Sequence, residues 1–117
     1  MYNLFELEKV EFTDFLKIGL AIGTIIEVEQ NKKARMPAYK LKIDFGDLGI
    51  KISSAQITEN YLEADLKGKQ IVAAINFPAK QVAGVKSEVL VLAGVCKEEG
   101  TILLEPSIKV RNGTRVL

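Results

Sequence analysis

Alternation of apolar and charged residues is the clearest pattern in this sequence, and it is strongest over residues 39–45. There the apolar Tyr39, Leu41, Ile43 and Phe45 alternate with Lys40, Lys42 and Asp44. A period of two predicts a β-strand with one buried face. Gly46 and Asp47 then predict a tight turn, because glycine adopts a positive φ at little steric cost. In the next predicted strand, residues 49–54, the same alternation would place Lys51 and Ser53 on the charged face, beside Lys40 and Lys42.

Two further elements flank this hairpin. Residues 18–29 predict a long first strand, with one face made by Ile22, Thr24, Ile26 and Val28. Gly19 and Gly23 within it predict a bend or a bulge, as a strand that curls into a barrel requires. After the hairpin, residues 58–68 predict a short helix, with Thr58 as its N-cap, apolar residues four positions apart and Gly68 at its end.

The order of elements favours one all-β architecture. Residues 69–77 and 88–96 predict two more strands, and we expect the apolar second one, which includes Cys96, to be buried on both sides. Weaker strand patterns cover residues 102–104 and 109–116. A short helix between strands 3 and 4 is the order of the five-stranded OB-fold barrel, and SH3-like barrels usually lack that helix. We therefore predict an OB-fold domain over residues 15–117, preceded by an N-terminal extension over residues 1–14. The barrel itself is expected to have small terminal extensions.

Composition excludes several classes of protein. The 117 residues fit a single domain, and 48% of them are hydrophobic. No apolar run approaches the ~20 residues of a membrane span, and the N-terminus has no signal-peptide pattern, so we expect a cytoplasmic protein without membrane insertion. With no histidine and one cysteine, the chain has no Ser-His-Asp or Cys-His catalytic system and no histidine- or cysteine-rich zinc site. We expect neither catalysis nor a cofactor nor a metal.

The charge distribution changes the meaning of a net charge of only +1. Residues 1–29 contain two basic and six acidic residues, whereas residues 30–58 contain six basic and two acidic ones. A basic segment inside a neutral chain is typical of a surface that binds a polyanion. The alternative is a solvated lysine-rich face with no ligand.

A segment near the middle of the chain carries a family resemblance. Residues 76–92 read NFPAKQVAGVKSEVLVL and resemble the tRNA-binding OB domain found at the end of methionyl-tRNA synthetases and in free-standing tRNA-binding proteins. Residues 33–46, 52–58 and 112–114 are similar to the CsaA subfamily, small proteins linked to protein export and chaperone activity. The resemblance covers about residues 15–117. It implies a non-enzymatic homodimer that binds tRNA or other structured RNA; the alternative is a chaperone that binds extended or unfolded peptides in an apolar cleft.

The candidate RNA-binding residues come from the second and third strands and the neighbouring loops, which form the oligonucleotide face of OB-folds. They are Arg35, Lys42, Lys51, Ser53, Asn76, Lys80, Lys86, Ser87 and Glu88. Lysines neutralise phosphates, whereas serine and glutamate side chains hydrogen-bond to ribose or to base edges. The resemblance implies an RNA contact at Ser87. The alternative for this loop is turn chemistry alone, set by Pro78 and Gly84.

Three features modify this picture. The resembled family begins its first strand with an Asp-hydrophobe-Arg-x-Gly pattern, and here Gly19 and Ala21 occupy the charged positions, while Gln81 replaces a basic residue. We therefore expect tRNA binding in a weakened form. Phe77 is expected in the core, which leaves few aromatic platforms for bases. The N-terminal segment is more apolar than a free tail, so we expect it to pack on the barrel or across a dimer axis; its apolar residues are Leu4, Phe5, Leu7, Phe12, Phe15 and Leu16.

Overall fold

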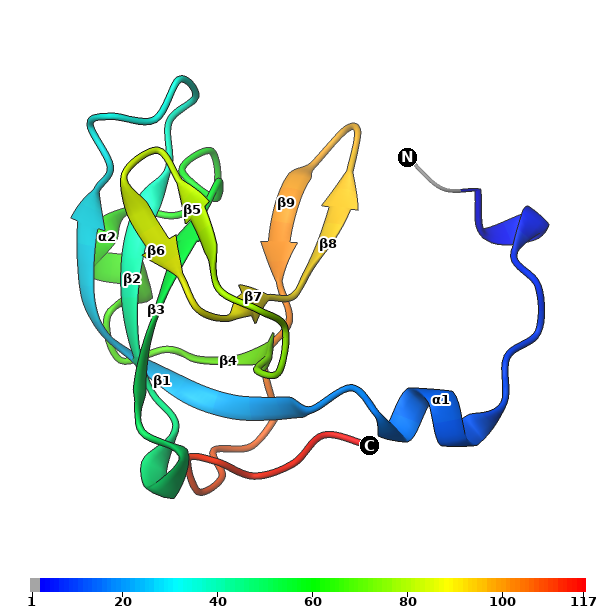
Figure 1. Ribbon diagram of the computed structural model, residues 1–117. Coiled ribbons are helices and arrows are strands. Elements are labelled where there is room, and N and C mark those ends of the chain that lie inside the picture. The colour runs from blue at the N-terminus through cyan, green and yellow to red at the C-terminus, as the bar shows by residue number, and fades with distance from the viewer. Residues whose placement is uncertain (1–2) are drawn as a thin grey trace.

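The computed structural model describes residues 3–117, and its centre is an antiparallel sheet that curls into a nearly closed barrel (Figure 1). The sheet order is β3-β2-β1-β4-β7, formed by β1 (Leu20–Gln30), β2 (Tyr39–Asp44), β3 (Ile50–Ala55), β4 (Gln70–Ala74) and β7 (Leu90–Val91). The helix α2 (Glu63–Leu66) lies between β3 and β4 in the chain. The predicted all-β class and the OB-like order of elements are confirmed.

Smaller elements surround the barrel. A one-turn helix, η2 (Gly46–Leu48), joins β2 to β3, and Gly46 has the predicted positive φ, 65°. Two hairpins project from the sheet: β5 (Lys80–Val82) with β6 (Val85–Ser87), and β8 (Ala93–Cys96) with β9 (Gly100–Leu103). Two short helices precede the barrel along the chain, η1 (Leu4–Glu6) and α1 (Phe12–Leu16).

The alternation in β2 produces the core. All four predicted apolar positions from Tyr39 to Phe45 are buried, and Leu41, Ile43 and Phe45 are fully so. They pack with Ile25 of β1 and, in the same cluster, with Leu66 of α2 and Ile71 of β4. Burial of these side chains is the main stabilising contribution to the fold.

The predicted face of β1 is wrong in its first half because the strand contains a bulge. The register with β2 shifts between Ile25 and Glu27, so that Ile25 and Val28 both lie opposite core residues of β2. An extra residue in one strand inverts the faces on its two sides, and periodicity alone does not locate it. Gly23 has a separate role: a Cβ there would lie 2.7 Å from the ring of Phe45.

Two other sequence predictions are wrong in detail. The helix begins at Glu63 rather than after Thr58, and the Asp65 carboxylate accepts a hydrogen bond from the N–H of Leu62 at its start. Residues 88–96 are not one strand buried on both sides, because the chain leaves the sheet after β7 and enters the β8–β9 hairpin. Val95 is consequently exposed and Cys96 is only half-buried.

The C-terminal segment lies against β1, although most of residues 109–116 form no strand. Thr114 accepts a hydrogen bond from the N–H of Ile22 through its carbonyl, and Arg115 makes a single β-bridge to Ala21. The buried side chain of Gln70 holds this segment, because it donates to the carbonyl of Val110 and accepts from the N–H of the same residue. A buried amide with both of its groups paired fixes the path of the chain.

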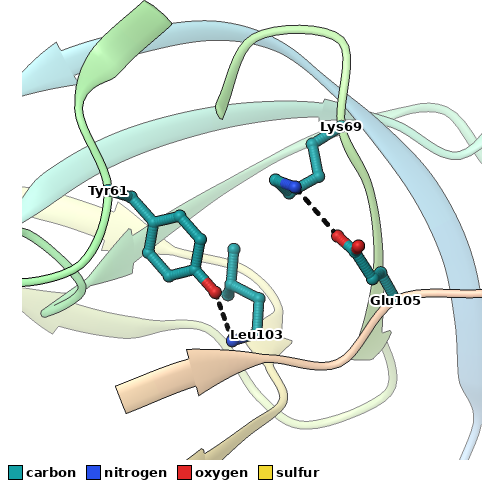
Figure 2. A network of polar contacts seen from close by, with 4 residues as sticks. All are labelled: Tyr61, Lys69, Leu103 and Glu105. Carbon is teal, nitrogen blue, oxygen red and sulfur yellow. Dashed lines mark hydrogen bonds and ion pairs between the residues drawn. The ribbon is translucent and has the colours of Figure 1, made fainter. Parts of the chain in front are cut away.

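A second set of polar contacts holds β9 and the segment after it against the α2–β4 region (Figure 2). The hydroxyl of Tyr61 accepts a hydrogen bond from the N–H of Leu103 at 3.0 Å, and Lys69 forms an ion pair with Glu105 at 3.0 Å. The Tyr39 hydroxyl in turn donates to the carbonyl of Tyr61. These contacts fix the position of β9, which forms one side of the apolar groove described below.

Residues 3–19 form an arm that leaves the barrel (Figure 1). None of the residues in η1 or α1 is buried, and Phe5 is 98% exposed. In the single chain the barrel therefore does not bury the apolar side chains of η1 and α1, although the end of the arm is hydrogen-bonded to it at Leu16, Lys17 and Gly19. The dimer axis remains the predicted alternative for covering these side chains. The predicted extension over residues 1–14 starts with two residues that lie outside the described part of the chain.

Candidate nucleic-acid interface

The outer face of β1 and β2 carries both signs of charge. Glu27 lies opposite Lys42 and Glu29 lies opposite Lys40, and the Lys42 ammonium is 3.4 Å from the Glu27 carboxylate. Opposite charges in cross-strand positions attract each other and offset each other's field. The acidic residues at the end of the first strand thus neutralise much of the basic character predicted for the second.

The predicted lysine face across β2 and β3 is wrong. Residues directly opposite each other in an antiparallel pair point to the same face, and Lys51 lies opposite the buried Ile43. Ser53 lies opposite Leu41 and is 1% exposed. Both residues are therefore on the inner face, whereas Ile50 is exposed. The sequence interpretation failed here because Ile50 and Ile52 alternate with Lys51 and Ser53, which indicates a buried isoleucine face. The register with β2 instead places the two isoleucines opposite Asp44 and Lys42.

Two loops bring the remaining cations together. The loop of residues 31–38 is held by Asn31, whose side-chain oxygen accepts from the N–H of Lys33, and the β5–β6 hairpin turns at Ala83 and Gly84, both at positive φ. The stem of Lys33 lies over Gly84, where a Cβ would be 3.2 Å from the Lys33 Cδ. We call these two loops together the basic loop pair; their exposed cations are Lys32, Lys33, Arg35, Lys80 and Lys86. Within the hairpin, the register places Lys80 and Lys86 on opposite faces.

The basic loop pair contains three of the predicted RNA contacts and two cations that the candidate set omits. Arg35, Lys80 and Lys86 were predicted from the sequence. Lys32 and Lys33 belong to the basic segment, but strand periodicity predicts the faces of strands and gives no information about loop residues. The sequence signal for these two lysines is their position in the loop between two predicted strands.

Ser87 and Glu88 close the barrel. The Ser87 hydroxyl accepts a hydrogen bond from the N–H of Ser54, and the Glu88 carboxylate accepts one from the N–H of Ile52, each at 3.1 Å. The backbone N–H of Glu88 donates to the carbonyl of Ile52 at 2.7 Å. These contacts pair the outer edge of β3 and fix the β5–β6 hairpin beside it.

Asn76 and Phe77 lie at the base of the same hairpin. The Asn76 amide accepts from the N–H of Gly19 and donates to the carbonyl of Lys17, both at 2.7 Å, so it connects the arm to the end of β4. Phe77 is 49% exposed, and its predicted core position is wrong. An exposed aromatic ring is a surface on which a base can stack.

The structure changes the interpretation of one position at which the sequence lacks an expected positive charge. Ala21 is 2% exposed and belongs to the core cluster, so it is not a surface position that lacks a cation. Gln81 is exposed and lies directly opposite Lys86 in the hairpin. Of these two positions, Gln81 is the one at which a basic residue would extend the basic loop pair.

An apolar groove lies on another side of the barrel, between the end of β3, β7 and the β8–β9 hairpin. Its volume is about 520 Å³. The groove is lined by Ser54, Ala55, Gln56, Ile57, Leu90, Val91, Leu92, Ala93, Val95, Thr101 and Leu103. Aliphatic side chains dominate this lining, so the groove is suited to apolar ligands rather than to phosphates.

Within residues 3–117 no group of three acidic or cysteine side chains is placed to hold a metal ion. Nor does any helix there have the length and apolar character needed to cross a membrane.

A small antiparallel barrel with a helix after its third strand and cations on the adjoining loops is an OB-type module of the class that binds oligonucleotides. A family model described as "Putative tRNA binding domain" matches residues 20–115. The chain belongs to this tRNA-binding-domain family.

Solved structures and curated relatives agree with this assignment. The chaperone CsaA of Bacillus anthracis is 53% identical with a TM-score of 0.89, covering 94% of this chain and all of that one. The CsaA chaperone protein of Picrophilus torridus is 46% identical with a TM-score of 0.87, covering 93% of this chain and all of that one. The methionine–tRNA ligase of Archaeoglobus fulgidus is 36% identical over 109 residues, 93% of this chain. The chain spans only 16% of that ligase's length.

Proposed function

We propose that this protein is a non-enzymatic, cytoplasmic tRNA-binding protein of the CsaA type that binds structured RNA through the basic loop pair. The observation that carries the proposal is that the stem of Lys33 lies beside Gly84 at the tip of the β5–β6 hairpin, so that the two loops with exposed cations are neighbours. Phosphate contacts supply most of the affinity of such surfaces. The paired charges on the outer face of β1 and β2 make that face a weaker candidate than the loops.

The non-enzymatic part of the proposal is supported by the residue types of the chain. It has no histidine, and its single cysteine is half-buried at the end of β8. The region shared with methionine–tRNA ligases is a small part of those enzymes. A binding role therefore accounts for all of the features of the site, without any reacting group.

Homodimerisation is the second part of the proposal, and the arm supports it. Its apolar side chains, among them Leu4, Phe5 and Phe12, are exposed in the single chain, although Phe12 and Phe15 contact each other with ring centroids 6.1 Å apart. Exposed apolar surface of this kind is usually covered by a partner. In a two-fold dimer each arm would bury its apolar side chains against the other copy.

The alternative function is binding of extended or unfolded peptides. The apolar groove supports it, because Leu90 and Val95 remain exposed at its edge. Both functions fit one molecule, since the groove and the basic loop pair are formed by different residues. Titration of an unfolded client protein against a variant with Leu90→Asp would test it, and unchanged client affinity would exclude the groove.

The test of RNA binding is the salt dependence of tRNA affinity. The double variant Lys80→Ala/Lys86→Ala should flatten the plot of log affinity against log salt by about 1.4 to 1.8, from ~0.7–0.9 for each phosphate contact. A matched control, Lys97→Ala/Lys109→Ala, removes two exposed charges elsewhere. Equal flattening in both variants would mean that binding is not located at the hairpin, and no measurable tRNA binding by the parent would reject the function.

A further inference from the structure

The single chain exposes more surface than a folded monomer of its mass. Its accessible surface is 8511 Å². A compact monomer of 12.9 kDa exposes about 6,300 Å², so the excess is about 2,200 Å². Obligate homodimers bury ~2,000–5,000 Å² in total, which is ~1,000–2,500 Å² for each copy. The excess therefore equals the area that a second copy of this chain would cover in a stable dimer.

The beginning of the arm has the sequence pattern of an edge strand. Phe5 and Leu7 alternate with Glu6 and Glu8, so an extended segment would carry the two apolar side chains on one face and both carboxylates on the other. Leu7 is already extended, with φ −73° and ψ 135°. The preceding η1 is one turn of three residues without a buried side chain. Because so short a helix has little stability of its own, a change to an extended conformation costs little free energy.

The apolar groove is suited to such a segment. None of its lining residues is charged, and Val95 of β8 is 63% exposed at its edge. Among the strands that the structure describes, β8 pairs only with β9. The outer edge of β9 is already used, because the Asn60 amide donates to the carbonyl of Thr101. The Tyr61 hydroxyl accepts from the N–H of Leu103 on the same edge. An extended segment can therefore add at the outer edge of β8.

We propose that the arm of one copy lies along β8 of a second copy, with Phe5 and Leu7 in that copy's apolar groove and Glu6 and Glu8 in solvent. A two-fold axis makes the same contact twice, so that each groove is completed by the arm of the other copy. The inference rests on the proposed homodimer and adds the place where the arm binds. A client peptide then has to displace the arm, which makes the arm a competitor built into the dimer.

Disulfide trapping tests this contact. In a Cys96→Ala background, Leu7→Cys/Val95→Cys should oxidise to a covalent dimer of twice 12.9 kDa, which a reducing agent separates. Leu7→Cys/Asp47→Cys is the matched control and should keep the single mass, because Asp47 has a 99% exposed side chain outside the groove. Covalent dimers of both variants would overturn the proposal. An oxidised product of single mass from Leu7→Cys/Val95→Cys would place the arm in its own groove and would also overturn it.

A second measurement needs no engineered cysteine. Val95→Asp puts a charge into the groove and should weaken dimerisation about tenfold or more in light scattering across a dilution series. Ile108→Asp makes the same kind of change at a 76% exposed position outside the groove and should dimerise like the parent. If the parent is a dimer but Val95→Asp dimerises equally well and no disulfide forms, the arm is not in the groove and the homodimer stands. A parent of single mass would reject both proposals.

Discussion

Ser87 and Glu88 allow a quantitative test of how the hairpin is held. Ser87→Ala removes the acceptor for the N–H of Ser54, and Glu88→Ala removes the carboxylate that accepts from the N–H of Ile52. A neutral hydrogen bond contributes ~0.5–1.5 kcal/mol and one to a charged group ~1.5–3 kcal/mol. Both side chains are half-buried, so we expect losses in the free energy of unfolding of about 1 kcal/mol for Ser87→Ala and about 2 kcal/mol for Glu88→Ala.

The assay combines denaturation with hydrogen exchange. For a chain of this length, ~2.1 cal/mol/K per residue of unfolding entropy makes 1 kcal/mol equivalent to about 4 °C in Tm. The amide of Ser54 should lose protection in Ser87→Ala, while Glu88→Gln, which retains an acceptor oxygen, should keep most of the protection at Ile52. Lys80→Ala is the control on the same hairpin and should leave Tm unchanged. Unaltered stability and protection in Ser87→Ala would refute the closing role of this side chain.

Three other predictions follow from packing, assembly and composition. Gly23→Ala should lower the free energy of unfolding by about 1–3 kcal/mol, because the added methyl meets the ring of Phe45. Gly94→Ala is the control and should change the free energy of unfolding little, because a Cβ has room there. Equal effects of the two substitutions in urea denaturation would contradict the packing argument. Light scattering at micromolar concentration should give twice the chain mass of 12.9 kDa, and a double Phe5→Ser/Phe12→Ser variant should give the single mass; a parent mass near 13 kDa would reject the dimer. Thermal melting should be the same with and without EDTA, and a lower Tm in EDTA would reveal a metal site made of oxygen ligands.

The fold could be predicted where one physical signal dominates. The strict alternation from Tyr39 to Phe45 places every side chain of β2 on its correct face, because four large apolar residues have only one face to bury. The order of strands and the helix before β4 then restricts the topology. At Ser53 the same reasoning fails, because serine fits either face and only the register with Leu41 decides between them.

The candidate site could be predicted in part for a related reason. Net charge along the chain locates the basic segment, but it does not reveal that Glu27 lies 3.4 Å from Lys42 or that Lys33 reaches Gly84 from a distant part of the sequence. The roles of Ser87 and Glu88 depend on an unpaired strand edge, which exists only after the barrel has formed. Contacts between segments far apart in the chain carry no local sequence pattern.

The basic loop pair is proposed to face RNA. A gain of affinity tests this proposal most directly, because damage to the fold cannot produce one. Gln81→Arg adds a cation opposite Lys86 at an exposed position, and Gln56→Arg adds the same charge at an exposed position after β3. The measurement is tRNA affinity across a salt series for the parent and both variants. We expect Gln81→Arg to bind more tightly and to steepen the salt dependence by about 0.7–0.9, with Gln56→Arg close to the parent. No gain in Gln81→Arg, or an equal gain in both, would contradict the account.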